Sequence, residues 1–388
     1  MLRRPYIIAA LAVAFLWLCQ FATVRYSYGG NWTGLFCIAP HMPVPEFLRS
    51  ERLYVFSNTD GYDGQIFHLI AHDPWMTRGS ANAIYGASFR YQRILVPALA
   101  WMLALGRDEH VHAAYFAVIL GFAFAGVFWL ARLAQVRGLH PAWGLAFMAV
   151  PATITSLDRM TADIALAALC VGFVLYAEAG QSWQVIAILA CAVLTRETAG
   201  LIVAGYCLFL LTRRQIARSI VSACALLPAG AWFLYITHGA ATSMAVGYLN
   251  WIPLYGFLER VIHPAVYRFG PLKNGVVMLF DFIALLGIGL TLIAVARMAI
   301  RRQWSANAAA IYALALAVVF LGKRDVWEDA YNFGRVLSPL LFLTFIEYFR
   351  APSVRGLLAA LTPMALIDLR ISLNAAGELE AIVRGLLK

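Results

Sequence analysis

Long apolar runs, separated by short polar segments, follow one another along almost the whole chain. A helix needs about 17 to 25 apolar residues to cross a bilayer, and counting such runs predicts roughly eleven transmembrane helices. The expected spans cover residues 5–25, 110–131, 141–156, 160–177, 182–195, 197–212, 216–237, 274–297, 305–321, 335–349 and 354–372. We therefore predict an all-α polytopic membrane protein with a single transmembrane domain over residues 1–388.

A shorter apolar segment, Ile94–Leu105, interrupts this series and contains Pro97. We expect a helix that lies in the membrane interface and does not cross, because the run is too short for a span. With this assignment the basic residues beside the spans gather on one side: Arg3, Arg4, Arg132, Arg137, Arg213, Arg214, Arg218, Arg297, Arg301, Arg302, Arg350 and Arg355. The positive-inside rule makes that side cytoplasmic. Two large loops, residues 26–109 and 238–273, are then expected on the outer side.

The composition excludes a soluble protein. Hydrophobic residues make up 62% of the chain and charged residues 13%, with a mean hydropathy of +0.74, which is too little charge to cover the surface of a soluble domain. The net charge of +10 is spread singly or in pairs at the ends of apolar runs. This distribution indicates contacts with membrane lipids or phosphates and no nucleic acid. Five of the six cysteines lie inside apolar runs, so neither a disulfide framework nor a zinc site is expected.

The polar stretch Thr59–Pro74 places three carboxylates and two histidines in an otherwise apolar chain. Its apolar residues recur with the period of a helix that lies against an apolar surface: Tyr62, Ile66, Leu69 and Ile70. An amphipathic helix is therefore expected, with Asp63, His68 and His72 on its polar side. Asp60 or Asp63 can cap its start.

His68 and His72 are four residues apart, a spacing that is compatible with a metal ion. The Glu-x-x-His context of a zinc protease is missing. We therefore expect no metal and no other cofactor, and interpret both histidines as hydrogen-bonding residues of a substrate site. A divalent ion is the alternative.

Further charged residues are expected at the outer ends of predicted spans, where an unpaired charge costs several kcal/mol. They are Asp158, Arg159, Asp163, Arg196, Glu197, Lys323, Arg324 and Arg335, and the second loop adds the aromatic residues Tyr248 and Trp251. Arg196 and Glu197 are neighbours that cannot point the same way on a helix, so we expect a separate partner for each. Two interpretations stay open, namely a ligand site or an ion-pair network that holds helices together.

These groups suit the transfer of a sugar from a lipid-phosphate donor. Such a donor carries a good leaving group, so an enzyme needs one base for the acceptor hydroxyl and cations for the departing phosphate. Asp63 is the expected base, with Asp60 as the alternative. Arginine binds phosphate through two parallel hydrogen bonds, and the expected phosphate-binding residues are Arg90, Arg93, Arg196, Lys323, Arg324 and Arg335. Sugar or acceptor contacts are expected from His68, His72, Asp158, Arg159, Asp163, Glu197, Tyr248 and Trp251.

Four short motifs carry a resemblance to a known family. They are Tyr62-Asp63-Gly64-Gln65-Ile66-Phe67, Ala71-His72-Asp73-Pro74, Tyr91-Gln92-Arg93-Ile94-Leu95 and Leu194-Thr195-Arg196-Glu197. In these motifs the chain resembles the GT-C superfamily of membrane glycosyltransferases, particularly a branch that acts on bacterial cell-surface polysaccharides. The second half is similar only in its topology. The family's more common acidic pair is Asp-Gly here, which keeps Asp60 open as the base.

The resemblance implies a polyprenyl-phosphate-linked hexose or pentose as donor, a glycan or lipid as acceptor, and inversion at the anomeric carbon. It also implies two interfacial helices in the first outer loop and a site on the periplasmic or exterior face of the bacterial cytoplasmic membrane. A transporter or flippase of lipid-linked sugars is the competing class. Repeated halves and charges at the bilayer midplane would be expected of it, whereas the charges here gather at predicted helix ends.

Overall fold

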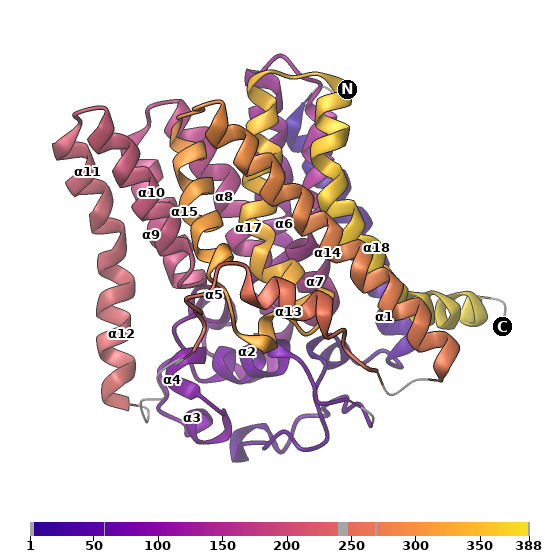
Figure 1. Ribbon diagram of the computed structural model, residues 1–388. Helices are drawn as coiled ribbons and strands as arrows, with labels where there is room; N and C mark the ends of the chain where they lie inside the picture. Colours follow the sequence, from indigo (N-terminus) through magenta and orange to yellow (C-terminus); the bar gives the residue numbers. More distant parts are fainter. Residues whose placement is uncertain (1–3, 58, 240–246, 268–269, 387–388) are drawn as a thin grey trace.

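The described part of the chain is a bundle of helices (Figure 1). The computed structural model describes residues 4–57, 59–239, 247–267 and 270–386 of the 388. Within these residues, extended pairing is limited to two isolated bridges, Ile38 with Val55 and Leu249 with Leu321. The predicted all-α class is therefore confirmed.

Five helices of the described residues are long and apolar enough to cross a membrane, so the chain has the character of a membrane protein. They are α1 (Pro5–Ser27), α6 (Asp108–Val136), the continuous segment Ile216–His238, α14 (Pro271–Ile300) and the first part of α18 (Val354–Leu386). The Ile216–His238 segment is built from α11 (Ile216–Ala223), η4 (Cys224–Leu226) and most of α12 (Leu227–Gly239). All five coincide with predicted spans.

Shorter helices occupy most of the other predicted spans. They are α8 (Asp163–Glu178), α9 (Ser182–Thr195), α10 (Ala199–Thr212), α15 (Ala306–Val319) and α17 (Ala330–Glu347). With 14 to 18 residues each, they measure about 21–27 Å, which is less than the ~30 Å hydrocarbon core of a bilayer. The sequence thus predicted these helices, and among the described residues the five longer ones have the length and composition of a full span.

The expected span over residues 141–156 is wrong as a single helix. The structure has a 3-10 helix, η3 (Pro141–Ala149), followed by α7 (Pro151–Arg159). Pro151 causes the break, because it has no N–H for the preceding turn and favours an extended conformation at Val150. The chain therefore changes conformation between two short helices instead of continuing as one rod.

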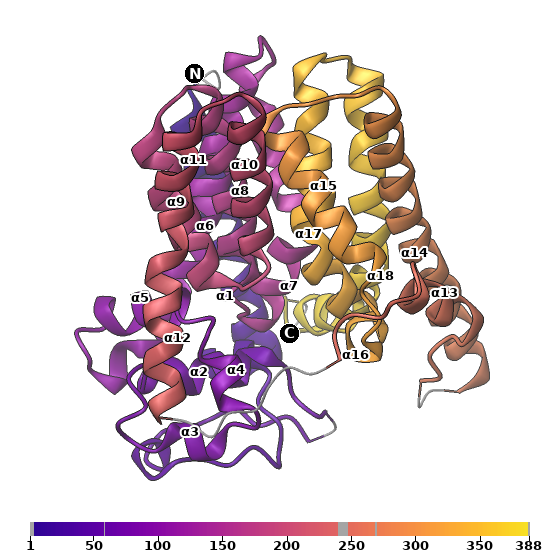
Figure 2. The ribbon, with the colours of Figure 1, turned by 60° about the vertical axis from the view of Figure 1, so that its left-hand side comes forward.

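A layer of short helices, built from residues 28–104 and called the first-loop layer below, covers one end of the bundle (Figures 1 and 2). It contains η1 (Trp32–Phe36), η2 (Glu46–Leu48), α2 (Asp63–His72), α3 (Ser80–Ala83), α4 (Ala87–Arg90) and α5 (Leu95–Leu103). With nine residues, α5 is about 13 Å long and too short to cross a bilayer. The N-terminus and the connections α10–α11, α14–α15 and α17–α18 lie at the opposite end.

The segment around Tyr248 and Asn250 is joined to a later segment of the chain. The remaining short elements are α13 (Tyr255–Ile262), α16 (Arg324–Trp327) and η5 (Tyr348–Arg350). Asn250 N–H donates a hydrogen bond to Phe320 O at 2.8 Å, and Gly322 N–H donates one to Tyr248 O at 2.9 Å. Two segments that are far apart in the sequence are therefore held side by side.

Helix α2 lies inside the protein, and both its apolar side and its expected polar side are largely buried. It packs against η1, α5 and α6, and His68 and His72 expose only 1% and 0% of their surface. Tyr62 occupies the N-cap position, so Asp63 is the first helical residue and Asp60 is exposed in the preceding loop. The expectation that an aspartate caps this helix is wrong, because both carboxylates lie outside the capping position.

Gly64 allows this close packing of α2. A Cβ atom at position 64 would lie 2.0 Å from the carbonyl oxygen of Arg159 and 3.0 Å from that of Phe36. Both obstacles are backbone atoms, which cannot rotate away as a flexible side chain can. Glycine therefore lets the start of α2 approach the end of α7.

We predict that Gly64→Ala displaces α2 and lowers the free energy of unfolding by about 1–3 kcal/mol, the usual cost of overpacking. Gly121→Ala is the matched control, because a Cβ atom at Gly121 meets no atom within 4 Å. Thermal unfolding in detergent micelles should give a lower midpoint for Gly64→Ala and an unchanged or higher one for Gly121→Ala. Equal midpoints for the two variants would contradict the role given to Gly64.

Candidate functional site

The Asp63 carboxylate is held by two arginines. Asp63 is 8% exposed, and as the first residue of α2 it also gains from the positive end of the helix dipole. Arg90, the last residue of α4, donates to Asp63 Oδ1, and Arg335 of α17 places Nη2 2.6 Å from Oδ2. Groups from elements that are far apart in the sequence thus converge on one carboxylate.

Arg335 also reaches Asp163, the first residue of α8. Its Nη1 lies 3.4 Å from Asp163 Oδ2, and Asp163 Oδ1 accepts a hydrogen bond from Arg196, which directly follows α9. Asp63, Arg90, Asp163, Arg196 and Arg335 therefore form one ionic network, called the central charge cluster below. Its arginines outnumber its carboxylates, so the cluster has capacity for a further anion.

Arg93 and Glu197 form a separate pair beside this cluster. Arg93 donates through Nη2 to Glu197 Oε1 at 2.7 Å and through Nε to Oε2 at 3.1 Å. The expectation that Arg196 and Glu197 have separate partners is confirmed, since Arg196 binds Asp163 and Glu197 binds Arg93. The fork of Arg93 occupies both oxygens of one carboxylate, which fixes the connection between α9 and α10 on the first-loop layer.

A row of aromatic and cationic side chains extends outward from Arg93. The Arg93 guanidinium lies 4.7 Å from the ring centre of Phe89, whose ring is 5.8 Å from that of Tyr248. Lys323 Nζ lies 4.2 Å from the Tyr248 ring centre. Tyr248 and Lys323 were predicted as site residues from two different loops. They lie in one row that ends at Arg93.

The charges around Asp63 determine its protonation. Burial alone would raise the pKa of the Asp63 carboxyl, but the charges of Arg335, Arg90 and Arg93 outweigh burial and hold the pKa well below its usual range. Asp63 is therefore ionised at neutral pH. Its basicity increases when one of the arginines turns to another anion.

Asp158 and Arg159 lie beside the central charge cluster behind a pair of tyrosines. Arg159 Nε is 3.2 Å from Asp158 Oδ2, which also accepts a 2.8 Å hydrogen bond from Tyr331. The Tyr331 ring is 6.0 Å from that of Tyr62, and the Arg335 guanidinium lies 4.8 Å from the Tyr62 ring centre. The pair is thus adjacent to the cluster without a described ion pair to it.

Three residues chosen from the sequence lie outside these contacts. Asp60 and Arg324 are exposed, and Trp251 is 96% exposed. Each belongs to a loop or a short helix that faces outward, so none of the three has a described contact with the central charge cluster. Asp60 was predicted as the alternative base, Arg324 as a phosphate ligand and Trp251 as a residue that contacts the sugar. These roles would need a substrate that binds at the protein surface.

The sequence reasoning missed a second buried ionic group in the C-terminal half. Asp281 of α14 accepts from Arg260 of α13, from Arg370 of α18 and from Tyr267, each at 2.7 Å. Asp281 and Arg370 inside apolar runs could have indicated this group. Charged residues occur in membrane helices mainly where they are paired. One carboxylate thus joins two guanidinium groups and a phenol, which suits a structural link between α13, α14 and α18.

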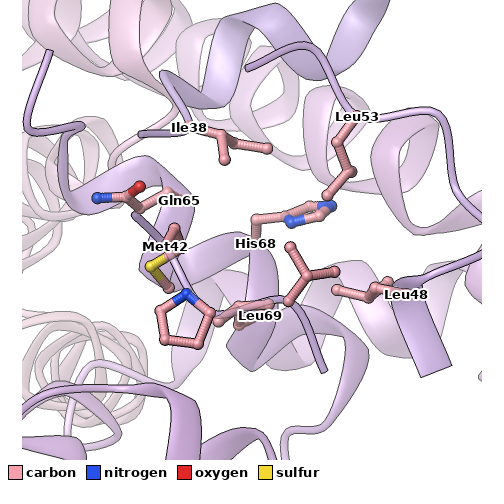
Figure 3. A pocket seen from close by; sticks show the side chains of 9 residues that line it. Ile38, Met42, Leu48, Leu53, Gln65, His68 and Leu69 are labelled. Atoms are coloured by element: carbon pink, nitrogen blue, oxygen red, sulfur yellow. The ribbon is translucent and has the colours of Figure 1, made fainter. Parts of the chain in front are cut away.

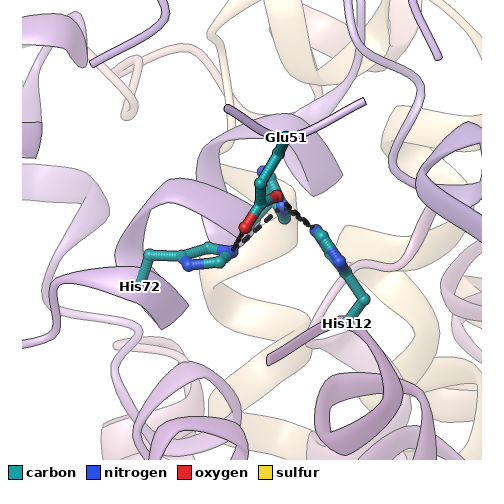
Figure 4. Close-up of side chains that lie close together, drawn as sticks. Glu51, His72 and His112 are labelled. Atoms are coloured by element: carbon teal, nitrogen blue, oxygen red, sulfur yellow. Dashed lines mark hydrogen bonds and ion pairs between the residues drawn. The ribbon is translucent and has the colours of Figure 1, made fainter. Parts of the chain in front are cut away.

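The two histidines of α2 belong to a third group, called the histidine cluster below, which also contains His112 and Glu51. His68 Nε2 lies 2.6 Å from His112 Nε2 and 3.3 Å from His72 Nε2. Figure 4 shows the Glu51 carboxylate between His72 and His112, with Oε2 3.2 Å from His112 Nε2 and Oε1 3.9 Å from His72 Nε2. One ligand atom from each of the four residues lies within 4.8 Å of the others.

The surroundings of His68 and His72 keep these two imidazoles uncharged. His68 also lines a cavity of about 10 Å³ between apolar side chains (Figure 3), including Ile38, Leu48 and Leu69. Burial, with the adjacent histidines, lowers the pKa of His68 well below its usual value, and burial lowers the pKa of His72 despite nearby carboxylates. Both rings are therefore neutral at pH 7.

Comparisons with known proteins provide no identification. No protein-family model, no curated protein and no solved structure matches the chain.

We predict that Arg335→Met destabilises the protein strongly, by about 3–5 kcal/mol, because it leaves two buried carboxylates short of a partner. Adding Asp63→Asn removes one of these charges, and its other partner Arg90 is partly exposed and can turn to water, so the double variant should unfold at a higher temperature than Arg335→Met alone. The measurement is thermal unfolding in detergent micelles at pH 7. If Asp63→Asn adds its own cost to that of Arg335→Met, the two side chains do not form the pair described.

Proposed function

We propose that this protein is a membrane glycosyltransferase that moves a sugar from a polyprenyl-phosphate donor to a glycan or lipid acceptor. The supporting observation is the contact of the Asp63 carboxylate with Arg90 and Arg335. It combines, within one group of contacts, a carboxylate that can accept a proton and guanidinium groups that can hold a phosphate. The resemblance to the GT-C superfamily, carried by motifs around Asp63, Arg93 and Arg196, agrees with this chemistry.

In the proposed reaction the acceptor hydroxyl gives its proton to Asp63 while its oxygen forms a bond to the anomeric carbon. The bond between that carbon and the phosphate oxygen breaks, and its electron pair leaves with the polyprenyl phosphate. Arg90 and Arg335 stabilise the charge that develops on the departing phosphate. Attack from the face opposite to the phosphate inverts the anomeric configuration.

The resting contacts of Asp63 fit a base that is switched on by the donor. While both arginines bind the carboxylate, its low pKa makes it a weak base. A donor phosphate that draws Arg90 away removes part of this stabilisation and makes Asp63 a stronger proton acceptor. Arg90 suits this role because its side chain is partly exposed, whereas that of Arg335 is buried. In this proposal the donor itself activates the base.

We further propose that this site faces the outside of the bacterial cytoplasmic membrane. The first-loop layer covers one end of the bundle, and the N-terminus and the arginine-rich connections α10–α11 and α14–α15 lie at the other (Figure 2). The positive-inside rule favours the arginine-rich end as cytoplasmic.

A transporter of lipid-linked sugars is less well supported by the position of the charges. Asp163 begins α8, Arg196 directly follows α9 and Arg335 lies near the start of α17. Transporters typically place such groups in interrupted helices at the bilayer midplane. Charges at helix ends fit a site at the interface between membrane and water.

Purified protein in nanodiscs provides the test of transfer, with undecaprenyl phosphate linked to radiolabelled mannose, glucose, galactose or arabinose. We expect release of undecaprenyl phosphate from one of these donors, and turnover that is lower on the order of a hundredfold in Asp63→Asn. Asp60→Asn is the matched control and should keep wild-type turnover. Asp63→Glu keeps the charge and should remain folded, which separates loss of the base from loss of structure. Wild-type turnover in a folded Asp63→Asn variant would exclude Asp63 as the base, and absence of release from all four donors would count against the transferase.

The orientation has its own test. Single cysteines at Ser57 and at Arg213, both exposed, are placed in a cysteine-free background and labelled with an impermeant maleimide in sealed vesicles. We expect the two positions to label from opposite sides, Ser57 from the outside. Labelling of both positions from one side would contradict the proposed topology.

A further inference from the structure

We infer that Glu51, His68, His72 and His112 form a binding site for one zinc ion. The inference does not rest on the proposed glycosyltransferase activity, because the histidine cluster and the central charge cluster share no residue. Asp63 begins α2, whereas His72 of the histidine cluster ends it, nine positions later.

The spacing of the four ligand atoms is close to that of a tetrahedral zinc site. Zinc–nitrogen bonds of 2.0–2.1 Å place neighbouring ligand atoms about 3.3 Å apart in a tetrahedron. The corresponding distances are 3.3 Å from His68 Nε2 to His72 Nε2, 3.2 Å from His112 Nε2 to Glu51 Oε2, and 2.6 Å from His68 Nε2 to His112 Nε2. All four ligand atoms lie within 4.8 Å of one another, so movements of the side chains bring them to the spacing of a tetrahedral site.

The hydrogen bonds of His72 point its free nitrogen toward the other ligands. Its Nδ1 lies 2.8 Å from Asp108 Oδ1, and a carboxylate can only accept, so Nδ1 carries the hydrogen. In the neutral ring Nε2 then has a free lone pair, which faces His68 and Glu51. Arg78 holds Asp108 in place through two hydrogen bonds of 2.8 and 2.7 Å. This is the outer arrangement that orients histidine ligands in zinc proteins.

Protons alone leave part of this group unsatisfied. One proton between His68 Nε2 and His112 Nε2 accounts for their 2.6 Å contact. The lone pair of His72 Nε2 and both oxygens of Glu51 still lack a donor, and these oxygens are closed to solvent and accept no described hydrogen bond. A single divalent cation accepts electron pairs from all four residues. Three imidazoles and one carboxylate are ligand types that zinc prefers.

A route to the site exists in the structure. Glu51 and His112 line an open hollow of about 980 Å³, together with Trp32 and Phe116. The hollow brings solvent to the side chains of Glu51 and His112, whereas the Glu51 oxygens, His68 and His72 lie behind this surface, so entry of an ion requires the Glu51 side chain to turn. With four protein ligands, the site corresponds to a structural zinc that fastens α2 and the Glu51 loop to α6.

The test uses the full chain, purified in detergent with a tag that contains no histidine. We expect about one zinc per chain by elemental analysis, and a higher unfolding temperature when zinc is added back after chelation. His112→Ala should lose at least tenfold in zinc affinity, whereas His110→Ala should keep the wild-type value. His110 is the matched control, because it lies two residues earlier on α6 and its side chain is 56% exposed.

Two further measurements keep the inference open to refutation if His112→Ala does not fold. Asp108→Asn removes no ligand and should weaken zinc binding about 10- to 100-fold, the usual effect of losing an outer partner. Cobalt added to the zinc-free wild type should give the visible absorption of a tetrahedral site, and zinc should abolish it. A wild-type protein that binds neither metal, with no change in unfolding temperature, would overturn the site and leave a proton-linked histidine group.

Discussion

The cost of burying a carboxylate in an apolar bundle governs how the end of this protein that carries the first-loop layer is assembled. Asp63 and Asp163 are both shielded from water, so each requires a guanidinium partner of suitable geometry. Arg335 serves both, and thereby connects the first-loop layer with α8 and α17. Apolar packing has no preferred direction, whereas these ion pairs fix which elements meet and in which register.

Much of the fold follows from local sequence patterns. The all-α class, the five long helices and the bounds of α9 could be read from apolar runs, because the length and period of a helix are properties of neighbouring residues. The break at Pro151 follows from the same local chemistry once proline is given its full weight. The separate partners of Arg196 and Glu197 were also predictable, since adjacent residues point in different directions on a helix.

The composition of each cluster could not be obtained in this way. His68 and His72 were visible as a pair on one helix, but Glu51 comes from a loop and His112 from α6, and no periodicity relates them. The contact of Asp63 with Arg335 likewise depends on how α17 packs. The burial of α2 was missed for a related reason. An amphipathic pattern shows that one face of a helix is polar, but that face can contact either water or charged side chains inside the protein.

The distance in sequence between Asp63 and Arg335 has a consequence for biosynthesis. The chain emerges from the ribosome in order, so α2 is made long before α17, and its carboxylate has no access to Arg335 until nearly the whole protein has been synthesised. Until then Arg90 of the same layer is the partner that Asp63 can reach, and the connection between the first-loop layer and α17 is among the last contacts to form.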